Sequence, residues 1–182
     1  YRNAPAQYRT YLQQVKRGEK KIQTGGLHPH ELVREYLEPK TVRVDDGGAD
    51  SNNSVDETTE AAWRAFVDKL RSSTDTTHLK RAIAVVDVSG SMYSLNDLDE
   101  YDSSQKASVM PIHVSVALGL VLSELADGPF RNQVITFEET PTWATIDGTS
   151  LSKRVEQMKS ISWGGSTNLL ATFDLILQKA DT

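Results

Sequence analysis

The chain has 182 residues, a formal net charge of −5 and no cysteine. This length allows one domain with an appendage. The lack of cysteine excludes disulfide bonds and fits a reducing, intracellular and cytoplasmic location. A negative net charge does not indicate a general nucleic-acid-binding surface. No apolar run is long enough to span a membrane. The first residue is Tyr1 and no signal peptide pattern follows, which indicates a fragment or a processed or partly observed chain.

Residues 1–44 are predicted to form a helical N-terminal segment. A first helix over 5–17 ends before Gly18, and a second over 29–37 ends before Pro39. Basic side chains gather at the end of the first helix, where they complement the helix dipole or contact RNA: Lys16, Arg17, Lys20 and Lys21. Residues 45–54 are polar and glycine-rich, which predicts a flexible linker.

Residues 55–74 are predicted to form a helix that packs on a following α/β domain. Ser54 and Glu57 match a capping box at its start. Large and small apolar side chains then recur on one side: Ala62, Trp63, Phe66, Val67 and Leu70. A helix that binds in the groove of a partner protein is the alternative.

Residues 75–182 alternate strand and helix patterns, as α/β domains do. The short apolar run 82–86 predicts a buried parallel strand. Residues 112–126 are almost apolar all round, which predicts a buried helix. Further strands are predicted over 132–137 and 142–146, the latter as an antiparallel partner at the sheet edge, and further helices over 150–160 and 169–179.

Oxygen-bearing side chains follow the first of these strands on alternate residues, as Asp87, Ser89 and Ser91. They lie where open α/β sheets bind ligands, at the carboxyl end of a strand. Hard oxygen ligands suit Mg²⁺ or Mn²⁺. Downstream, the glycines of Gly164-Gly165-Ser166-Thr167-Asn168 allow close backbone approach, and Thr167 presents a hydroxyl just before a helix. The pattern predicts a cation site.

These motifs resemble the von Willebrand factor A superfamily over residues 75–182. The resemblance implies a doubly wound, Rossmann-like α/β fold with a metal-ion-dependent adhesion site. Its two serines and threonine, here Ser89, Ser91 and Thr167, would ligate the metal, and Asp87 would act mainly through water. In the superfamily a third loop, after the next strand, supplies another aspartate. This chain stops at Thr182, before that strand, so we expect a domain that is incomplete at its C-terminus, whose first strand has one unpaired apolar edge.

A closer resemblance is to uncharacterised plant and fungal intracellular proteins that carry a von Willebrand A domain after a helical region. It lies in five stretches: Trp63–Val67, Val86–Met92, Val116–Leu120, Val134–Phe137 and Phe173–Leu177. In layout these proteins are similar to the Ro RNA-binding autoantigen. No biochemical function follows from this resemblance.

The adhesion-site resemblance implies a metal-dependent protein–protein interaction module without catalysis, whose partner presents an Asp or Glu to Mg²⁺ or Mn²⁺. The first alternative is a ribonucleoprotein scaffold of Ro type, with RNA bound by a region outside this chain. The second is a metal-dependent hydrolase. The sequence lacks the G-x-S-x-G, P-loop and D-x-D motifs that would favour an enzyme. His113, near the metal loop in sequence, is either structural or a general base.

Residues 93–108 form an acidic insertion between the metal loop and the buried helix. Its carboxylates are those of Asp97, Asp99, Glu100 and Asp102. The insertion is either a solvated loop or a ligand-gating loop. In the second case one of its carboxylates would occupy the open metal position, or repel an acidic partner through space.

Overall fold

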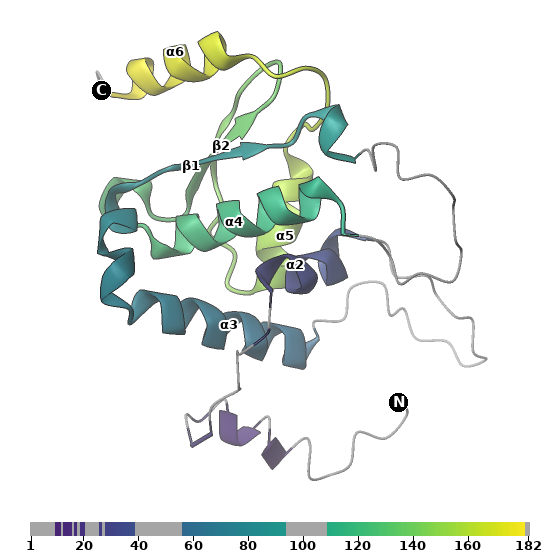
Figure 1. Cartoon of the computed structure of the whole chain (residues 1–182), viewed down its shortest axis with the longest axis vertical. Coiled ribbons are helices and arrows are strands. Elements are labelled where there is room, and N and C mark those ends of the chain that lie inside the picture. The colour runs from purple at the N-terminus through teal and green to yellow at the C-terminus, as the bar shows by residue number, and fades with distance from the viewer. Residues whose placement is uncertain are drawn as a thin grey trace, which may run out of the picture.

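The computed structural model describes residues 28–38, 56–93 and 109–180, together with residues 10, 11, 13–15, 17, 19, 20 and 26. The chain is a mixed α/β protein (Figure 1), which confirms the class predicted from the alternating pattern. Its helices and strands are α2 (Pro29–Leu37), α3 (Glu57–Arg71), β1 (Ala84–Asp87), α4 (Pro111–Leu125), β2 (Gln133–Phe137), β3 (Trp143–Thr145), α5 (Leu151–Ser160) and α6 (Leu169–Ala180). Short 3-10 helices are η1 (Thr74–Arg81), η2 (Gly90–Tyr93) and η3 (Gly128–Phe130). The predicted linker, the acidic insertion and most of the predicted helix 5–17 lie outside the described residues.

The sheet has three strands in the order β1-β2-β3. β1 and β2 are parallel, with Asp87 opposite Phe137, and the long connection between them contains α4. β2 and β3 are antiparallel, which confirms the predicted edge hairpin. Among the described residues β1 pairs with β2 alone, so its other edge is free, as expected for this segment.

Helix α4 packs closely on β1 through a glycine. A Cβ atom at Gly119 would overlap the side chain of Val86, so only glycine lets the two elements approach this far. Val116 and Leu120, on neighbouring turns of α4, have no exposed surface. The residues of this contact belong to the hydrophobic core.

The N-terminal helices belong to the same core. Leu32 and Val33 of α2 and Trp63 and Val67 of α3 are buried in one cluster with the side chains of α4, β1 and α5. The indole Nε1 of Trp63 donates to Oε1 of Glu124 on α4 over 2.8 Å. Figure 1 shows α2 and α3 on the same side of the sheet as α4 and α5, with α6 on the other side.

The start of α3 differs from the sequence prediction. The helix begins at Glu57, and its N-cap is Asp56 rather than Ser54. The carboxylate of Asp56 accepts from the backbone N–H groups of Thr58 and Thr59 at 2.8 and 3.3 Å. An ionised carboxylate caps the positive end of a helix at least as well as a hydroxyl, and it occupies the position directly before the helix.

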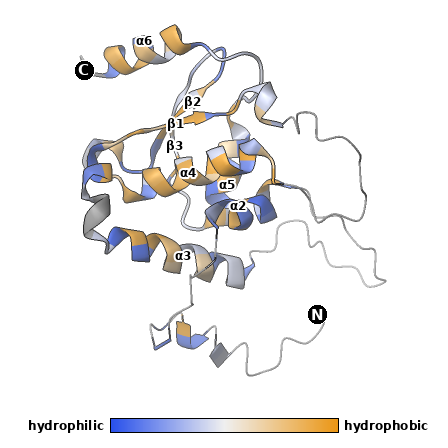
Figure 2. Ribbon diagram, in the orientation of Figure 1, coloured by the Kyte–Doolittle hydropathy of each residue, from blue (hydrophilic) through white to orange (hydrophobic). Residues whose placement is uncertain are grey.

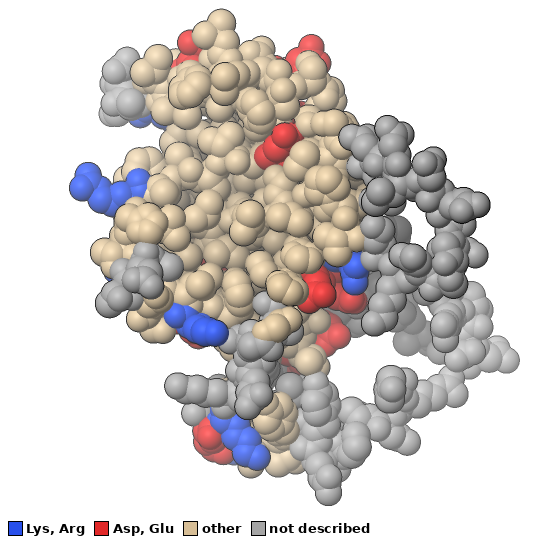
Figure 3. Space-filling model, in the orientation of Figure 1, with Lys and Arg blue, Asp and Glu red and all other residues tan. Residues whose placement is uncertain are grey.

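The two most apolar helices are only partly covered (Figure 2). In α4, predicted to be buried all round, Val114 and Leu118 lie one turn apart and are 37% and 51% exposed. In α6, Leu170 and Phe173 are 73% and 56% exposed. The face seen in Figure 3 carries few charged side chains. Apolar side chains are therefore exposed on both helices, on opposite sides of the sheet.

Candidate functional site

The loop after β1 brings the first three predicted site residues together. The backbone N–H of Ser89 donates to Oδ1 of Asp87 over 3.0 Å, a local turn typical of aspartate that ends the strand. The hydroxyl oxygens of Ser89 and Ser91 lie 3.2 Å apart. Ser89 is buried and Ser91 is exposed, so the pair reaches from the core to the surface.

The glycine loop before α6 lies directly against this first loop. The backbone N–H of Gly164 donates to the carbonyl of Val88 over 3.1 Å, and that of Gly90 donates to the carbonyl of Gly165 over 3.3 Å. Gly164 and Gly165 have φ values of 123° and 68°, which glycine adopts without strain. The two loops therefore meet at the carboxyl end of β1.

Thr167 lies on the second loop and is exposed. Its hydroxyl makes no hydrogen bond with the residues that the structure describes. The next residue, Asn168, caps the last helix, because its Oδ1 accepts from the backbone N–H of Ala171 over 3.0 Å. The structure thus groups Asp87, Ser89 and Ser91 and places Thr167 on the adjoining loop, where its hydroxyl has no partner among the described residues.

Two carboxylates at the same edge were missed by sequence reasoning. Glu138 and Glu139 directly follow β2, the strand next to β1. Glu138 is 5% exposed and accepts from the hydroxyl of Thr136 over 3.3 Å. Oε2 of Glu139 would lie 3.1 Å from a Cβ atom at Gly165. Acidic residues after a neighbouring parallel strand are the signal that could have identified them.

His113 makes its polar contacts outside the two loops, with Met110 and Glu38, and has a structural environment. It is 1% exposed, its Nδ1 accepts from the backbone N–H of Met110 over 3.1 Å, and its Nε2 lies 3.3 Å from Oε1 of Glu38. Loss of hydration on burial lowers the pKa of His113, although the charge of Glu38 acts in the opposite direction. These contacts join α4 to the end of α2.

The donor set at the edge of the sheet consists of hydroxyl and carboxylate oxygens. Among the described residues, no group of three or more His, Cys, Asp and Glu side chains could hold a metal ion. Any cation at this edge would therefore depend on serine and threonine hydroxyls. The predicted gating residues lie outside the described residues: Asp97, Asp99, Glu100 and Asp102.

Comparison with protein families covers both parts of the chain. The model described as "Domain of unknown function (DUF7788)" matches residues 81–182, which is more than half of the chain. The chain belongs to the DUF7788 family. The DUF7788 region runs from β1 to α6 and contains both loops of the candidate site. A second model, described as "Domain of unknown function (DUF2828)", matches residues 1–75.

A viral protein is similar to nearly the whole DUF7788 chain. "Uncharacterized protein L728" of Acanthamoeba polyphaga mimivirus is 35% identical over 178 residues, which is 98% of this chain and 26% of that protein. The chain thus spans about a quarter of the length of this curated relative. No solved structure matches the chain. Within the described part, none of the helices has the length and apolar character needed to cross a membrane.

Proposed function

We propose that this DUF7788 region is a von Willebrand A-type module, with the doubly wound fold of that superfamily, that binds an acidic partner protein through a divalent cation. The observation that carries the proposal is the meeting of two hydroxyl-bearing loops at the carboxyl end of β1, joined by the backbone hydrogen bonds of Gly90 and Gly164. Ligands of open α/β sheets bind at this edge. The placement of α4 and α6 on opposite sides of the sheet supports the same fold.

The residues present fit a hard cation. Neighbouring ligands of octahedral Mg²⁺, at 2.0–2.1 Å from the ion, lie about 3 Å apart. The hydroxyl oxygens of Ser89 and Ser91 are 3.2 Å apart, close to that separation. With Thr167 they would hold the ion, and Asp87, whose Oδ1 already accepts from Ser89, would act through water. The donor chemistry favours Mg²⁺ or Mn²⁺ over zinc.

A bound cation would supply an open coordination position for a carboxylate. Hydroxyl ligands are neutral, so they leave the charge of the ion largely unbalanced, and an Asp or Glu of a partner would balance it. In the described part of the loops, no hydroxyl is paired with a histidine that could act as its base. His113, on α4, is engaged by Met110 and Glu38 instead. We therefore propose binding without catalysis.

Metal binding is tested by measuring thermal unfolding in EDTA and in millimolar Mg²⁺ or Mn²⁺. A ligand that binds only the folded state raises the melting temperature. We expect Thr167→Ala to abolish that rise, and Ser166→Ala, on the same exposed loop, to retain it. A wild-type melting temperature that does not respond to metal, or the same response in both variants, would contradict the proposal.

The partner chemistry is tested separately by calorimetric titration. A short peptide with a single aspartate should bind in Mg²⁺ and not in EDTA. The same peptide with asparagine should not bind in either buffer, because a neutral amide cannot balance the charge of the ion. Equal heats from the two peptides would exclude recognition through a carboxylate.

A further inference from the structure

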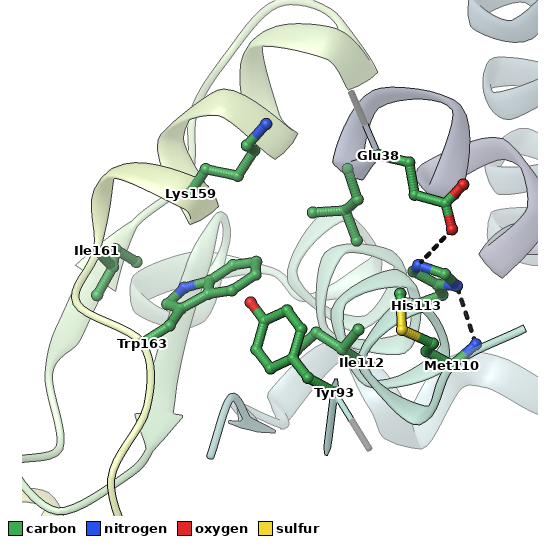
Figure 4. A pocket seen from close by; sticks show the side chains of 9 residues that line it. Glu38, Tyr93, Met110, Ile112, His113, Lys159, Ile161 and Trp163 are labelled. Carbon is green, nitrogen blue, oxygen red and sulfur yellow. Dashed lines mark hydrogen bonds and ion pairs between the residues drawn. The ribbon is translucent and has the colours of Figure 1, made fainter. Parts of the chain in front are cut away.

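A cavity of about 440 Å³ (Figure 4) is lined in part by Tyr93, two residues after Ser91, and by Trp163, directly before Gly164. It opens between the end of α2, the 3-10 helix η2, the start of α4 and the segment that follows α5. Ile112 and His113 line it and are each 1% exposed. Cavities of this size hold small organic ligands.

The walls of the cavity are mainly apolar and aromatic. Leu37 and Ile112 provide aliphatic surface, and Tyr93 and Trp163 provide two rings whose centroids lie 6.1 Å apart at 44°. A flat hydrocarbon group gains contact and loses water against such rings. A strongly hydrated ligand such as a sugar would find few hydrogen-bonding groups here.

Some polar side chains that line the cavity have a partner among the described residues, and others do not. The carboxylate of Glu38 is already engaged by Nε2 of His113, at 3.3 Å. Lys159 has no ion pair with the described residues, and Figure 4 shows it on α5 on the same side of the cavity as Trp163, across from Glu38. The hydroxyl of Tyr93 has no hydrogen-bond partner among the described residues. Three donors that line the cavity therefore lack a partner among the described residues: the ammonium of Lys159 and the hydroxyl of Tyr93, both at exposed positions, and the buried indole Nε1 of Trp163. Lys159 is the cation among them.

We propose that this cavity binds a flat, apolar carboxylic acid. The carboxylate would accept from the ammonium of Lys159 and the hydroxyl of Tyr93, and the apolar body would lie against Trp163. Charge-assisted hydrogen bonds to a carboxylate are stronger than those to a neutral group, so the acid is favoured over its amide. The proposal requires no metal and is independent of the function proposed above.

The tryptophans provide a site-resolved test. The protein has three, so its ¹⁵N spectrum should contain three indole N–H signals. Nε1 of Trp63 and of Trp143 donate to Glu124 and Gln133 over 2.8 and 3.0 Å, whereas Nε1 of Trp163 is buried without a partner among the described residues. Trp163→Phe assigns the third signal. The probe is 2-naphthoate, titrated into the full chain in EDTA.

We expect saturable movement of the Trp163 signal, with the other two unchanged. The neutral analogue 2-naphthamide should bind about tenfold more weakly, because it lacks the charge that pairs with Lys159. Lys159→Gln should weaken naphthoate binding by a similar factor, and Lys153→Gln, exposed on the same helix, should not. Ile161→Phe, which narrows the cavity, should weaken both ligands.

The unchanged Trp63 and Trp143 signals show in each variant that the fold is retained. A Trp163 signal that does not respond to naphthoate would overturn the proposal. So would equal binding of naphthoate and naphthamide, or naphthoate affinity that is the same in Lys159→Gln as in the wild type.

Discussion

The carboxylate of Glu60, on α3, accepts a hydrogen bond from the backbone N–H of Leu151, the first residue of α5, over 2.8 Å. Its second oxygen accepts from Ser152 over 2.9 Å. Glu60 is 3% exposed, so a side chain distant in sequence satisfies the free N–H groups at the start of α5 from inside the protein.

We expect Glu60→Gln to lower the free energy of unfolding by about 1–3 kcal/mol, since the amide can accept only through its single oxygen and leaves a buried N–H unpaired. Urea unfolding measures the change. Glu156→Gln, on the exposed side of α5, is the matched control and should change stability by less than about 0.5 kcal/mol. Equal effects of the two substitutions would show that the buried contact does not stabilise the fold.

The close contact of Gly119 with Val86 predicts that Gly119→Ala destabilises the protein. Alanine favours helix by about 1 kcal/mol, but overpacking a core costs roughly 1–3 kcal/mol. Because the new methyl group would overlap Val86, we expect the cost to exceed the gain and the melting temperature to fall by a few degrees. A melting temperature above that of the wild type would show that α4 can move away from the sheet freely.

A second substitution tests the cause of that loss. Val86→Ala alone should destabilise the core, because it removes buried methyl groups. Combined with Gly119→Ala, it makes room for the new methyl group. The double variant should therefore be more stable than the sum of the two single effects predicts. Simple additivity would mean that the two positions do not interact.

The environment of His113 predicts a dependence of stability on pH. Nδ1 accepts from Met110, so a second proton on the ring would place two donors face to face. Burial lowers the pKa of His113 in the folded state. The unfolded chain, with a histidine pKa of about 6.5, therefore binds this proton more readily. The contribution of neutral His113 to the stability of the folded state is fully present above pH ~6.5 and is lost as the pH falls below that value.

The measurement is the melting temperature from pH 7.5 to pH 5. We expect the fall toward pH 5 to be smaller in His113→Gln than in the wild type, whatever the stability of the variant at pH 7.5. His78→Gln, at an exposed position, should keep the full wild-type slope. Parallel curves for wild type and His113→Gln would exclude His113 as the titrating group.

The free edge of β1 predicts self-association of a polypeptide of residues 1–182. Unpaired strand edges and exposed apolar patches both favour pairing with another molecule. Val85 of β1 is 47% exposed and lies beside this edge. Light scattering across a range of concentrations should show dimers or larger species, reduced by Val85→Lys but not by Glu156→Lys. A strictly monomeric wild type would contradict this prediction.

Local structure could largely be predicted from the sequence. The helix predicted over 29–37 has those bounds in the structure, because Pro29 and Pro39 limit it at either end. The strand pairings agree with the buried parallel strand predicted from the short apolar run 82–86 and with the antiparallel edge strand predicted over 142–146. The capping residue of α3 was misassigned to Ser54 because two polar residues, Ser54 and Asp56, stand near the helix start and only geometry decides between them.

Contacts between distant residues could not be predicted in this way. Glu60 is an acidic residue near a helix start, and nothing in its local sequence indicates that it reaches α5. The same holds for Glu38 and His113, and for the cavity beside them, which depends on four elements brought together by folding. Of the candidate site, residue spacing placed Asp87, Ser89 and Ser91 in one loop, whereas the acidic pair Glu138–Glu139 required the order of the strands.

The joint core of α2, α3 and the sheet limits how this protein can be recombined. The two family models divide the chain between residues 75 and 81, yet Trp63 and Glu60 on one side bind Glu124 and Leu151 on the other. A chimera that joins the first part of one relative to the second part of another would therefore combine core side chains that do not pack against one another. Such exchanges should succeed only when the facing residues of α3, α4 and α5 are transferred together.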